Sequence, residues 1–199
     1  MHVSRLSRTL GGALLGAALA TGAMTAPAQA APPAPSASSG ERSQAAPAAV
    51  RVIRYDASRA AEFRTVVDQG AQIWNQHVRN VRFVAGTPAD VVVYADNGWP
   101  RAQPAGLGRG RVWMGRQATA QGHYALRIAS HELGHILGLP DRRTGLCSDL
   151  MSGASAGTSC RNPNPNAAEI AEVERNFQFG VSGVTPGVTI TERVPASAR

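Results

Sequence analysis

The sequence predicts an α+β fold, built as a single domain near residues 50–180. Short runs of β-branched residues and longer stretches of helical period succeed one another as a strand, a long helix, three strands, a second helix, an irregular loop and a last helix. Both ends of the chain lack any such period. What remains is about 130 residues, a normal size for one domain.

The first half of the domain predicts a strand, a long helix and three further strands. Residues 49–55 (AVRVIRY) mix β-branched residues with alternating arginines, as a strand does. From Ser58 the apolar residues recur at intervals of three and four, which indicates one buried helix face. These positions are Phe63, Val66, Val67, Gly70, Ile73, Trp74 and His77. Strands are predicted at 81–85 (VRFVA), 90–95 (DVVVYA) and 110–115 (GRVWMG), separated by turns rich in Gly, Pro and Asn.

Two more helices are predicted in the second half. One begins near Tyr124 and has its apolar residues on one side, at Leu126, Ile128, Leu133, Ile136 and Leu137. The other begins at NAAE (166–169), where Asn166 can cap the helix and Glu169 can reach back to it, a capping box.

The ends of the chain predict export and little folded structure. Residues 1–30 have a charged start, a short apolar run and an Ala-Gln-Ala ending, which is typical of a secretory signal peptide. A membrane anchor is the alternative, but the Gly- and Ala-rich run falls short of the roughly 20 strongly apolar residues that a span needs. Residues 31–49, rich in Ala, Pro and Ser, predict a linker or short propeptide, and residues 181–199 a flexible C-terminal tail.

The basic composition indicates no partner by itself. All 20 basic residues are arginine, and the net charge of +7 is spread along the chain, partly in the signal and the tail. Because no arginine-rich run is interleaved with aromatic residues, we expect no nucleic-acid partner. No membrane partner is expected either, and we expect a monomer.

The two cysteines, Cys147 and Cys160, follow the second predicted helix. In an exported chain an isolated pair is most simply one disulfide. Thiolate ligation of a metal is the alternative, but their separation lacks the close spacing of thiolate sites.

The stretch SHELGHILGLPD (130–141) has the spacing of a zinc site. His131 and His135 are four apart, so on a helix they can converge on one ion, and Glu132 projects beside the first of them. Gly138 can end the helix and reverse the chain, which brings Asp141 back as a third ligand. The fourth position then stays open for a water, which Glu132 can deprotonate as a general base. The alternative is an amphipathic helix that happens to carry two histidines.

The extended pattern H-E-x-x-H-x-x-G-x-x-D resembles that of the metzincin zinc peptidases, most of which have a third histidine at its last position. With an aspartate at that position, the pattern resembles that of the snapalysins, the small neutral metalloproteases of actinomycetes. The segments GAQIWN (70–75), CSDLMSG (147–153) and CRNPNPNA (160–167) are similar too. The resemblance implies a mixed sheet, an active-site helix, a C-terminal helix, and Met151 in a tight turn beneath the metal. It also implies the Cys147–Cys160 disulfide around that turn.

Two positions depart from that resemblance. Family members often have a tyrosine two residues after the aspartate, where this chain has Arg143, whose role is open between steadying the substrate carbonyl oxygen and a plain solvated charge. Some members bind calcium just before the motif helix. The matching residues here, Tyr124 and Leu126, are poor calcium ligands, which is evidence against such a site.

These observations predict an extracellular zinc endopeptidase that acts on proteins or peptides and holds one zinc ion. We expect the substrate to pair with an edge strand, for which residues 110–115 are the candidate. The resemblance further implies a preference for an aromatic residue just after the scissile bond. The alternatives are a catalytically silent, zinc-stabilised binding module and a zinc hydrolase that is no peptidase, such as an amidase.

Overall fold

The computed structural model describes residues 49–192. The predicted signal peptide and nearly all of the predicted linker lie outside these residues, as does the end of the predicted tail. Between residues 49 and 192 no helix is long and apolar enough to cross a membrane.

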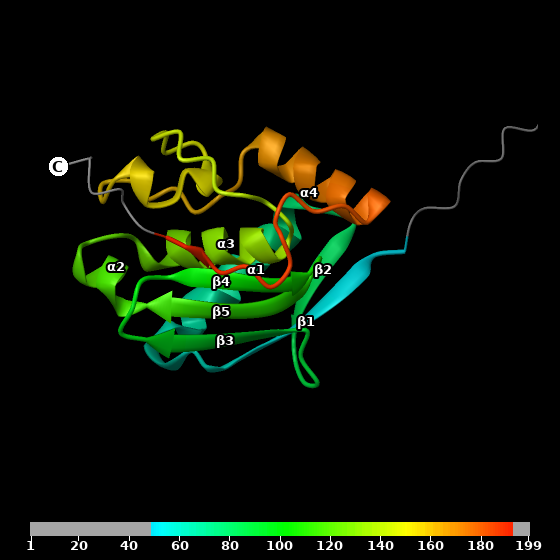
Figure 1. The fold of residues 1–199 in the computed structure, drawn as a ribbon, viewed down its shortest axis with the longest axis horizontal. Coiled ribbons are helices and arrows are strands. Elements are labelled where there is room, and N and C mark those ends of the chain that lie inside the picture. Colours follow the sequence, from blue (N-terminus) through cyan, green and yellow to red (C-terminus); the bar gives the residue numbers. More distant parts are fainter. Residues whose placement is uncertain (1–48, 193–199) are drawn as a thin grey trace, which may run out of the picture. The chain divides into compact units, whose positions relative to one another are not determined.

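A mixed sheet forms one layer of the domain (Figure 1). Its strands within the described residues are β1 (Arg51–Arg59), β2 (Val81–Ala85), β3 (Val91–Asp96), β4 (Arg101–Gly106), β5 (Arg109–Gly115) and β6 (Ile190–Thr191). Their order across the sheet is β2-β1-β3-β5-β4-β6. The first four are parallel to one another, whereas β4 runs antiparallel to both of its neighbours. The predicted α+β fold with a mixed sheet is confirmed.

The helices are α1 (Arg64–His77), α2 (Arg116–Ala120), α3 (Ala125–Ile136) and α4 (Ala167–Phe179), with 3-10 turns η1 (Ala61–Phe63) and η2 (Leu150–Ala156). The three helices that the periodicity predicts are therefore present. At the start of α4, Asn166 and Glu169 form the predicted capping box. The short α2 was not predicted.

The core lies between one face of the sheet and the helices α1 and α3. Burial alternates along the strands, so Ile53, Val93 and Val112 are covered while their neighbours in sequence are not. The two helices approach closely at Gly70, where an added Cβ would lie 3.1 Å from the backbone nitrogen of Ser130. Trp74 of α1 also donates a hydrogen bond of 2.8 Å to the Ser130 carbonyl. These contacts fix α3, which carries the histidines, over the sheet.

The structure corrects the prediction of an edge strand at 110–115. These residues lie in β5, which pairs with β3 on one side and β4 on the other, so β5 has no free edge. Beyond β5 lies β4, which β6 pairs with only at Arg101 and Ala102; β4 has the sequence RAQPAG and therefore no β-branched or aromatic residue to reveal it. Its Pro104 fits a position near a sheet edge, where a missing N–H is tolerated.

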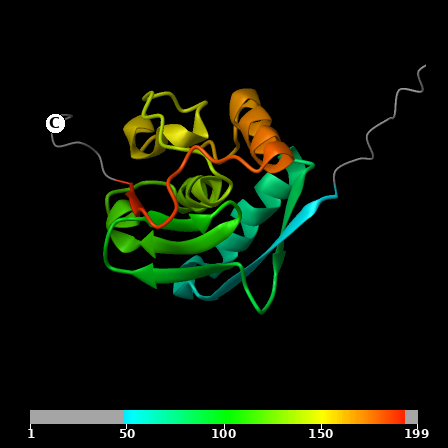
Figure 2. The ribbon, with the colours of Figure 1, turned by 45° about the vertical axis from the view of Figure 1, so that its right-hand side comes forward.

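Residues 181–192, the first part of the predicted flexible tail, make backbone hydrogen bonds to the domain. Gly183 donates a hydrogen bond to the carbonyl of Gly138, and Gly187 donates one to that of Pro104. Ile190 and Thr191 then form β6 against β4. Figure 2 shows this segment, in red, running beside α3 to the sheet. Its backbone hydrogen bonds hold it there without any apolar period in the sequence.

Candidate metal centre

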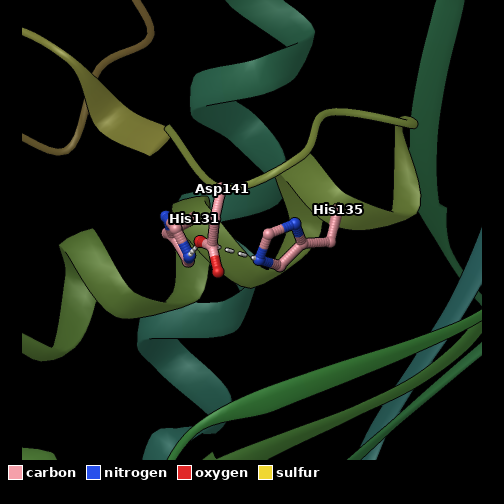
Figure 3. Close-up of side chains that lie close together, drawn as sticks. All are labelled: His131, His135 and Asp141. Carbon is pink, nitrogen blue, oxygen red and sulfur yellow. Dashed lines mark ion pairs between the residues drawn. The ribbon is translucent and has the colours of Figure 1, made fainter. Parts of the chain in front are cut away.

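Three predicted ligands converge at the C-terminal end of α3. His131 and His135 lie one turn apart on the helix, with their ring centroids 4.7 Å apart. Gly138 follows the helix with a φ of +90°, a conformation that side chains other than glycine rarely adopt, and so turns the chain back. The turn brings Asp141 Oδ1 to 3.3 Å from His131 Nε2 and 3.6 Å from His135 Nε2 (Figure 3). One ligand atom of each residue lies within 4.8 Å of the other two.

Backbone carbonyls fix the outer nitrogens of both imidazoles. His131 Nδ1 lies 3.0 Å from the Leu150 carbonyl, and His135 Nδ1 lies 2.8 Å from that of Leu139. When Nδ1 donates its proton to these carbonyls, each Nε2 presents a lone pair toward Asp141. Burial also lowers the pKa of His135 to about 4, which keeps that ring neutral.

The atoms that face one another in this cluster fit a cation. His131 Nε2 and Asp141 Oδ1 are buried, and outside the cluster of histidines and carboxylates they have no hydrogen-bond partner. Burial lowers the pKa of His131, but the carboxylates of Glu192 and Asp141 outweigh it and raise that pKa well above its ordinary value. Positive charge is therefore favoured at Nε2, either as a proton or as a metal ion. Two imidazoles and a carboxylate are a normal donor set for zinc.

Glu132 lies beside this cluster and is fully buried, with neither carboxylate oxygen hydrogen-bonded. Burial raises the pKa of Glu132 well above its usual value, and the neighbouring carboxylates of Glu192 and Asp141 raise it further, against the charge of His131. A buried, unpaired carboxyl is costly to keep in a stable fold, and such groups are concentrated at functional sites.

The turn η2 forms the floor beneath the histidines. Met151 is fully buried there, and its Sδ would lie 2.8 Å from a Cβ added to Gly134, between the two histidines. The backbone nitrogen of Met151 donates a hydrogen bond of 2.8 Å to Glu169 Oε1, which ties the turn to α4. Met151 thus packs against the ligand-bearing helix, as the resemblance implies.

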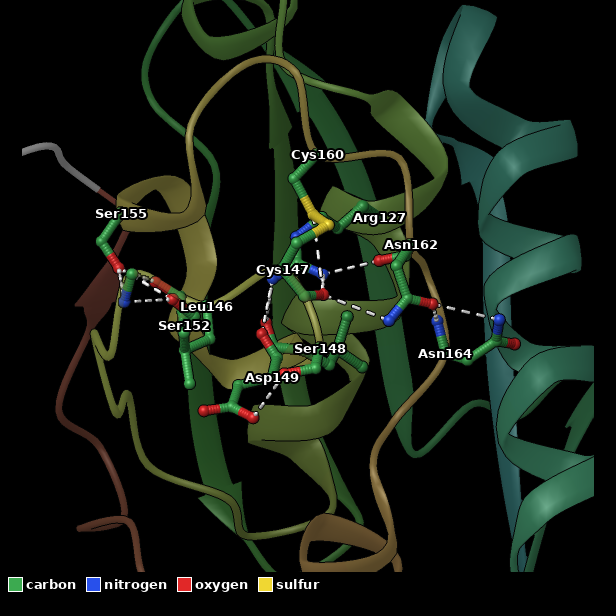
Figure 4. Close-up of a disulfide and its surroundings, with 12 residues drawn as sticks. Arg127, Leu146, Cys147, Ser148, Asp149, Ser152, Ser155, Cys160, Asn162 and Asn164 are labelled. Carbon is green, nitrogen blue, oxygen red and sulfur yellow. Dashed lines mark hydrogen bonds between the residues drawn. A yellow bond between two sulfur atoms is a disulfide. The ribbon is translucent and has the colours of Figure 1, made fainter.

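Arg127 and the disulfide hold the loop that leads into this turn (Figure 4). The predicted bond between Cys147 and Cys160 is present. The guanidinium of Arg127, almost fully buried, donates to the carbonyls of Cys147, Asp149, Leu150 and Asn162. No pattern in the sequence predicts this role for Arg127, since a single arginine among twenty carries no signal of it.

Arg143 and Glu192 are the other residues that join the site. Arg143 Nη2 lies 2.8 Å from Asp141 Oδ2, and its Nη1 lies 3.0 Å from Glu192 Oε1. Glu192 Oε2 lies 2.7 Å from His131 Nε2. Although burial alone would raise it, the pKa of Glu192 is lowered to about 2 by His131, the Ala154 amide and Arg143. Glu192 lies 51 positions after Asp141, and no local spacing could have predicted it.

A small pocket opens beside His131, with a cavity volume of about 20 Å³. Its walls come from the start of α3, the chain just before it, and the loop after Met151. They include His123, Tyr124, Ile128, Ala154 and Gly157.

A family model described as the Streptomyces extracellular neutral proteinase (M7) family matches residues 49–180. The chain belongs to this family. Membership confirms the predicted resemblance to small neutral metalloproteases of actinomycetes and, with it, the predicted class of enzyme, a zinc metalloprotease.

Several proteins named extracellular small neutral protease are similar to this M7 chain. That of Streptomyces caespitosus is 45% identical over 130 residues, which cover 64% of this chain and 98% of that protein. That of Streptomyces sp. (strain C5) is 42% identical over 136 residues, which cover 67% of this chain but only 58% of that protein. These names confirm the predicted extracellular location.

Among solved structures, archaemetzincin from Methanopyrus kandleri is similar with a TM-score of 0.44 and 11% identity. The match covers 66% of this chain and 97% of that one. The M7 match ends at residue 180, so the segment that carries β6 and Glu192 lies beyond it.

Proposed function

We propose that this M7 protein is a zinc endopeptidase in which His131, His135 and Asp141 hold one zinc ion and Glu132 transfers protons. The observation that carries the proposal is the pair of imidazole Nε2 atoms turned toward a carboxylate, with each Nδ1 held by a carbonyl. Such an arrangement is the usual outer support of a histidine metal ligand. A zinc ion held there would polarise the scissile carbonyl and acidify a water.

Glu132 is the group suited to move the proton. Its position next to His131, its burial and its free oxygens support its role as the acceptor of the proton from the attacking water. The protonated Glu132 then donates that proton to the leaving nitrogen. A carboxyl whose pKa is raised by burial suits the first step, because its carboxylate is a stronger base than an exposed one and so takes the proton from the water more readily.

Replacement of Glu132 tests the mechanism. We expect Glu132→Gln to keep its zinc but to lower peptide hydrolysis by at least about 100-fold, the usual size of a lost general base. Casein hydrolysis and zinc content are measured on the full chain and on a chain ending at residue 180. Glu62→Gln is the matched control, since Glu62 is exposed and pairs with Arg116 away from the site. Unchanged turnover in the Glu132 variant would contradict the role of Glu132 as the general base.

The pocket beside His131 supports the preference for an aromatic residue just after the scissile bond. Its apolar lining includes Tyr124, Ile128 and Ala154, beside the polar His123, Arg127 and Glu192, and these apolar walls favour an apolar side chain. A peptide series that differs only at that position measures kcat/KM for Phe, Ala and Asp. We expect Phe to exceed Ala by about 10-fold or more, the scale of several buried methylene groups. Equal values for the three peptides contradict the proposed preference.

A further inference from the structure

The segment 181–192 follows the open side of the site. Gly183 N donates a hydrogen bond of 2.8 Å to Gly138 O, at the turn that leads to Asp141. Gly187 N donates one of 2.7 Å to Pro104 O, and Glu192 N donates one of 2.9 Å to Pro100 O. The segment is therefore anchored both to the ligand-bearing turn and to the sheet.

Strand β6 occupies the sheet edge that a peptide substrate would need. Ile190 pairs with Ala102 and Thr191 with Arg101, antiparallel along β4. An extended peptide binds by adding a strand to an exposed sheet edge, and β4, which packs next to α3, would be such an edge without β6. While β6 is paired, the edge near Ala102 offers no free backbone groups to a substrate.

Glu192 projects from the end of β6 into the metal centre. Its Oε2 lies 2.7 Å from His131 Nε2 and has no other hydrogen-bond partner, and only 4% of the residue is exposed. Its Oε1 accepts a hydrogen bond from the Ala154 amide and pairs with Arg143. An added Cβ at Gly153 would overlap this carboxylate, so the absence of a side chain there leaves room for it. The surrounding residues thus provide both the space and the polar partners for the Glu192 carboxylate.

A carboxylate at this position completes the enclosure of the centre. Ligand atoms of His131, Glu132 and Glu192 lie within 4.8 Å of one another, so the Glu192 carboxylate is close both to the first ligand and to the proposed base. His131, Glu132 and His135 are each 1% exposed or less, although a polypeptide must reach them for hydrolysis. Three carboxylates crowd together here, and their mutual repulsion is relieved when a cation lies among them.

We propose that residues 181–192 are an intramolecular inhibitor of the site: β6 takes the place of a substrate strand, and the Glu192 carboxylate takes the ligand position beside His131 that a water or substrate carbonyl needs. The inference rests on the proposed function of the centre. In this proposal Arg143 stabilises the inhibited state, because its guanidinium pairs with Glu192 and donates a hydrogen bond to the Thr191 carbonyl. Release or removal of the segment opens the β4 edge and the metal position together.

A cut in the folded full chain tests the inhibition. A specific protease site is placed at Thr185–Pro186, which are exposed, so that the chain folds intact and is cut afterwards. A tethered segment acts at an effective concentration of roughly millimolar, and cutting and dilution abolish that advantage. We therefore expect kcat/KM for a peptide substrate to rise at least about 10-fold after the cut. Full activity before the cut, with no rise after it, contradicts the inhibition.

Binding of the released segment provides a measurement that needs no hydrolysis. The zinc-loaded Glu132→Gln protein, folded as the full chain, cut at Thr185–Pro186 and separated from the released segment, is titrated with a labelled synthetic peptide of residues 187–199. We expect saturable binding, weakened at least about 10-fold by Glu192→Gln in the peptide, because a charged ligand and its partner at Arg143 are lost. Thr189→Ala, at an exposed neighbouring position, is the matched control and should leave binding unchanged.

The two measurements separate the possible failures. Substrate hydrolysis that is unaffected by the cut, together with no peptide binding, overturns the inhibitor and leaves the peptidase intact. Glu192-dependent binding without hydrolysis in any form of the chain overturns the proposed function and, with it, the inhibitory role, even though the docking is real. Equal binding of the Glu192→Gln peptide shows that β6 alone docks and removes Glu192 from the metal position.

Discussion

At the residue scale, each histidine of the centre is held by a specific backbone carbonyl. The carbonyls of Leu150 and Leu139 orient the two imidazoles, and the one at Leu139 lies in the same turn that returns the chain to Asp141. The ligand geometry therefore depends on loops that begin only after α3 has ended. This dependence makes Asp141 the most informative ligand to replace.

We expect Asp141→Ala to lower zinc affinity by at least about 100-fold, since loss of even an outer partner costs 10- to 100-fold. Asp141→His should recover part of the affinity, because imidazole is a normal zinc ligand, although its ring is longer than the carboxylate and loses the pairing with Arg143. Zinc content is measured after dialysis of chains that end at residue 180, so that Glu192 cannot substitute. Asp56→Ala, outside the site, is the control, and full zinc retention in Asp141→Ala would exclude Asp141 as a ligand.

At the scale of elements, the close contact between α3 and η2 determines which residue fits at position 134, between the two histidines. Gly134 faces Met151 and the ring of Trp74, so that α1, α3 and the turn meet at one point. The same turn is held from outside by Arg127, by the disulfide and by Glu169 of α4. The position of the turn beneath the metal centre therefore depends on contacts with the helices α1, α3 and α4 and on the disulfide-bonded loop.

This packing predicts that Gly134→Ala destabilises the domain. The added Cβ would lie 2.8 Å from Met151 Sδ and 3.2 Å from Trp74 Cζ2, an overpacking that costs about 1–3 kcal/mol. Alanine regains at most about 1 kcal/mol of helix propensity, so the net effect is a loss. Urea unfolding measures the change in the free energy of unfolding. Gly98→Ala is the control, because its new Cβ would lie 3.3 Å from side-chain atoms of Arg101 and Asp96. A more stable Gly134→Ala would contradict the tight contact.

At the scale of the whole molecule, metal binding and folding are coupled. The centre gathers buried groups from α3, from the turn after it and from the segment after α4, and several of their polar atoms have no other partner. A ligand that binds only the folded chain stabilises it in proportion to the logarithm of its concentration.

We expect the thermal midpoint of the protein to rise with free zinc and to fall on chelation. At a free zinc concentration 1,000-fold above its dissociation constant the stabilisation amounts to about 4 kcal/mol. Calorimetry at several buffered zinc concentrations measures the shift. Magnesium at the same concentrations is the control, because it prefers oxygen ligands and octahedral geometry. A midpoint that does not respond to zinc would mean that the folded chain does not bind it.

The sequence by itself determined the elements whose signal is local. Helical periodicity, the capping box at Asn166, the spacing of His131 and His135 and the turn at Gly138 all act within a few residues, and each is present in the structure. Only the tertiary structure decided the rest. Strand β4 has weak β propensity and exists because β5 pairs with it, and β6 and Glu192 reach the centre through hydrogen bonds to residues more than forty positions away. Contacts between such distant segments depend on the folded sheet and helices, so no local pattern in the chain encodes them.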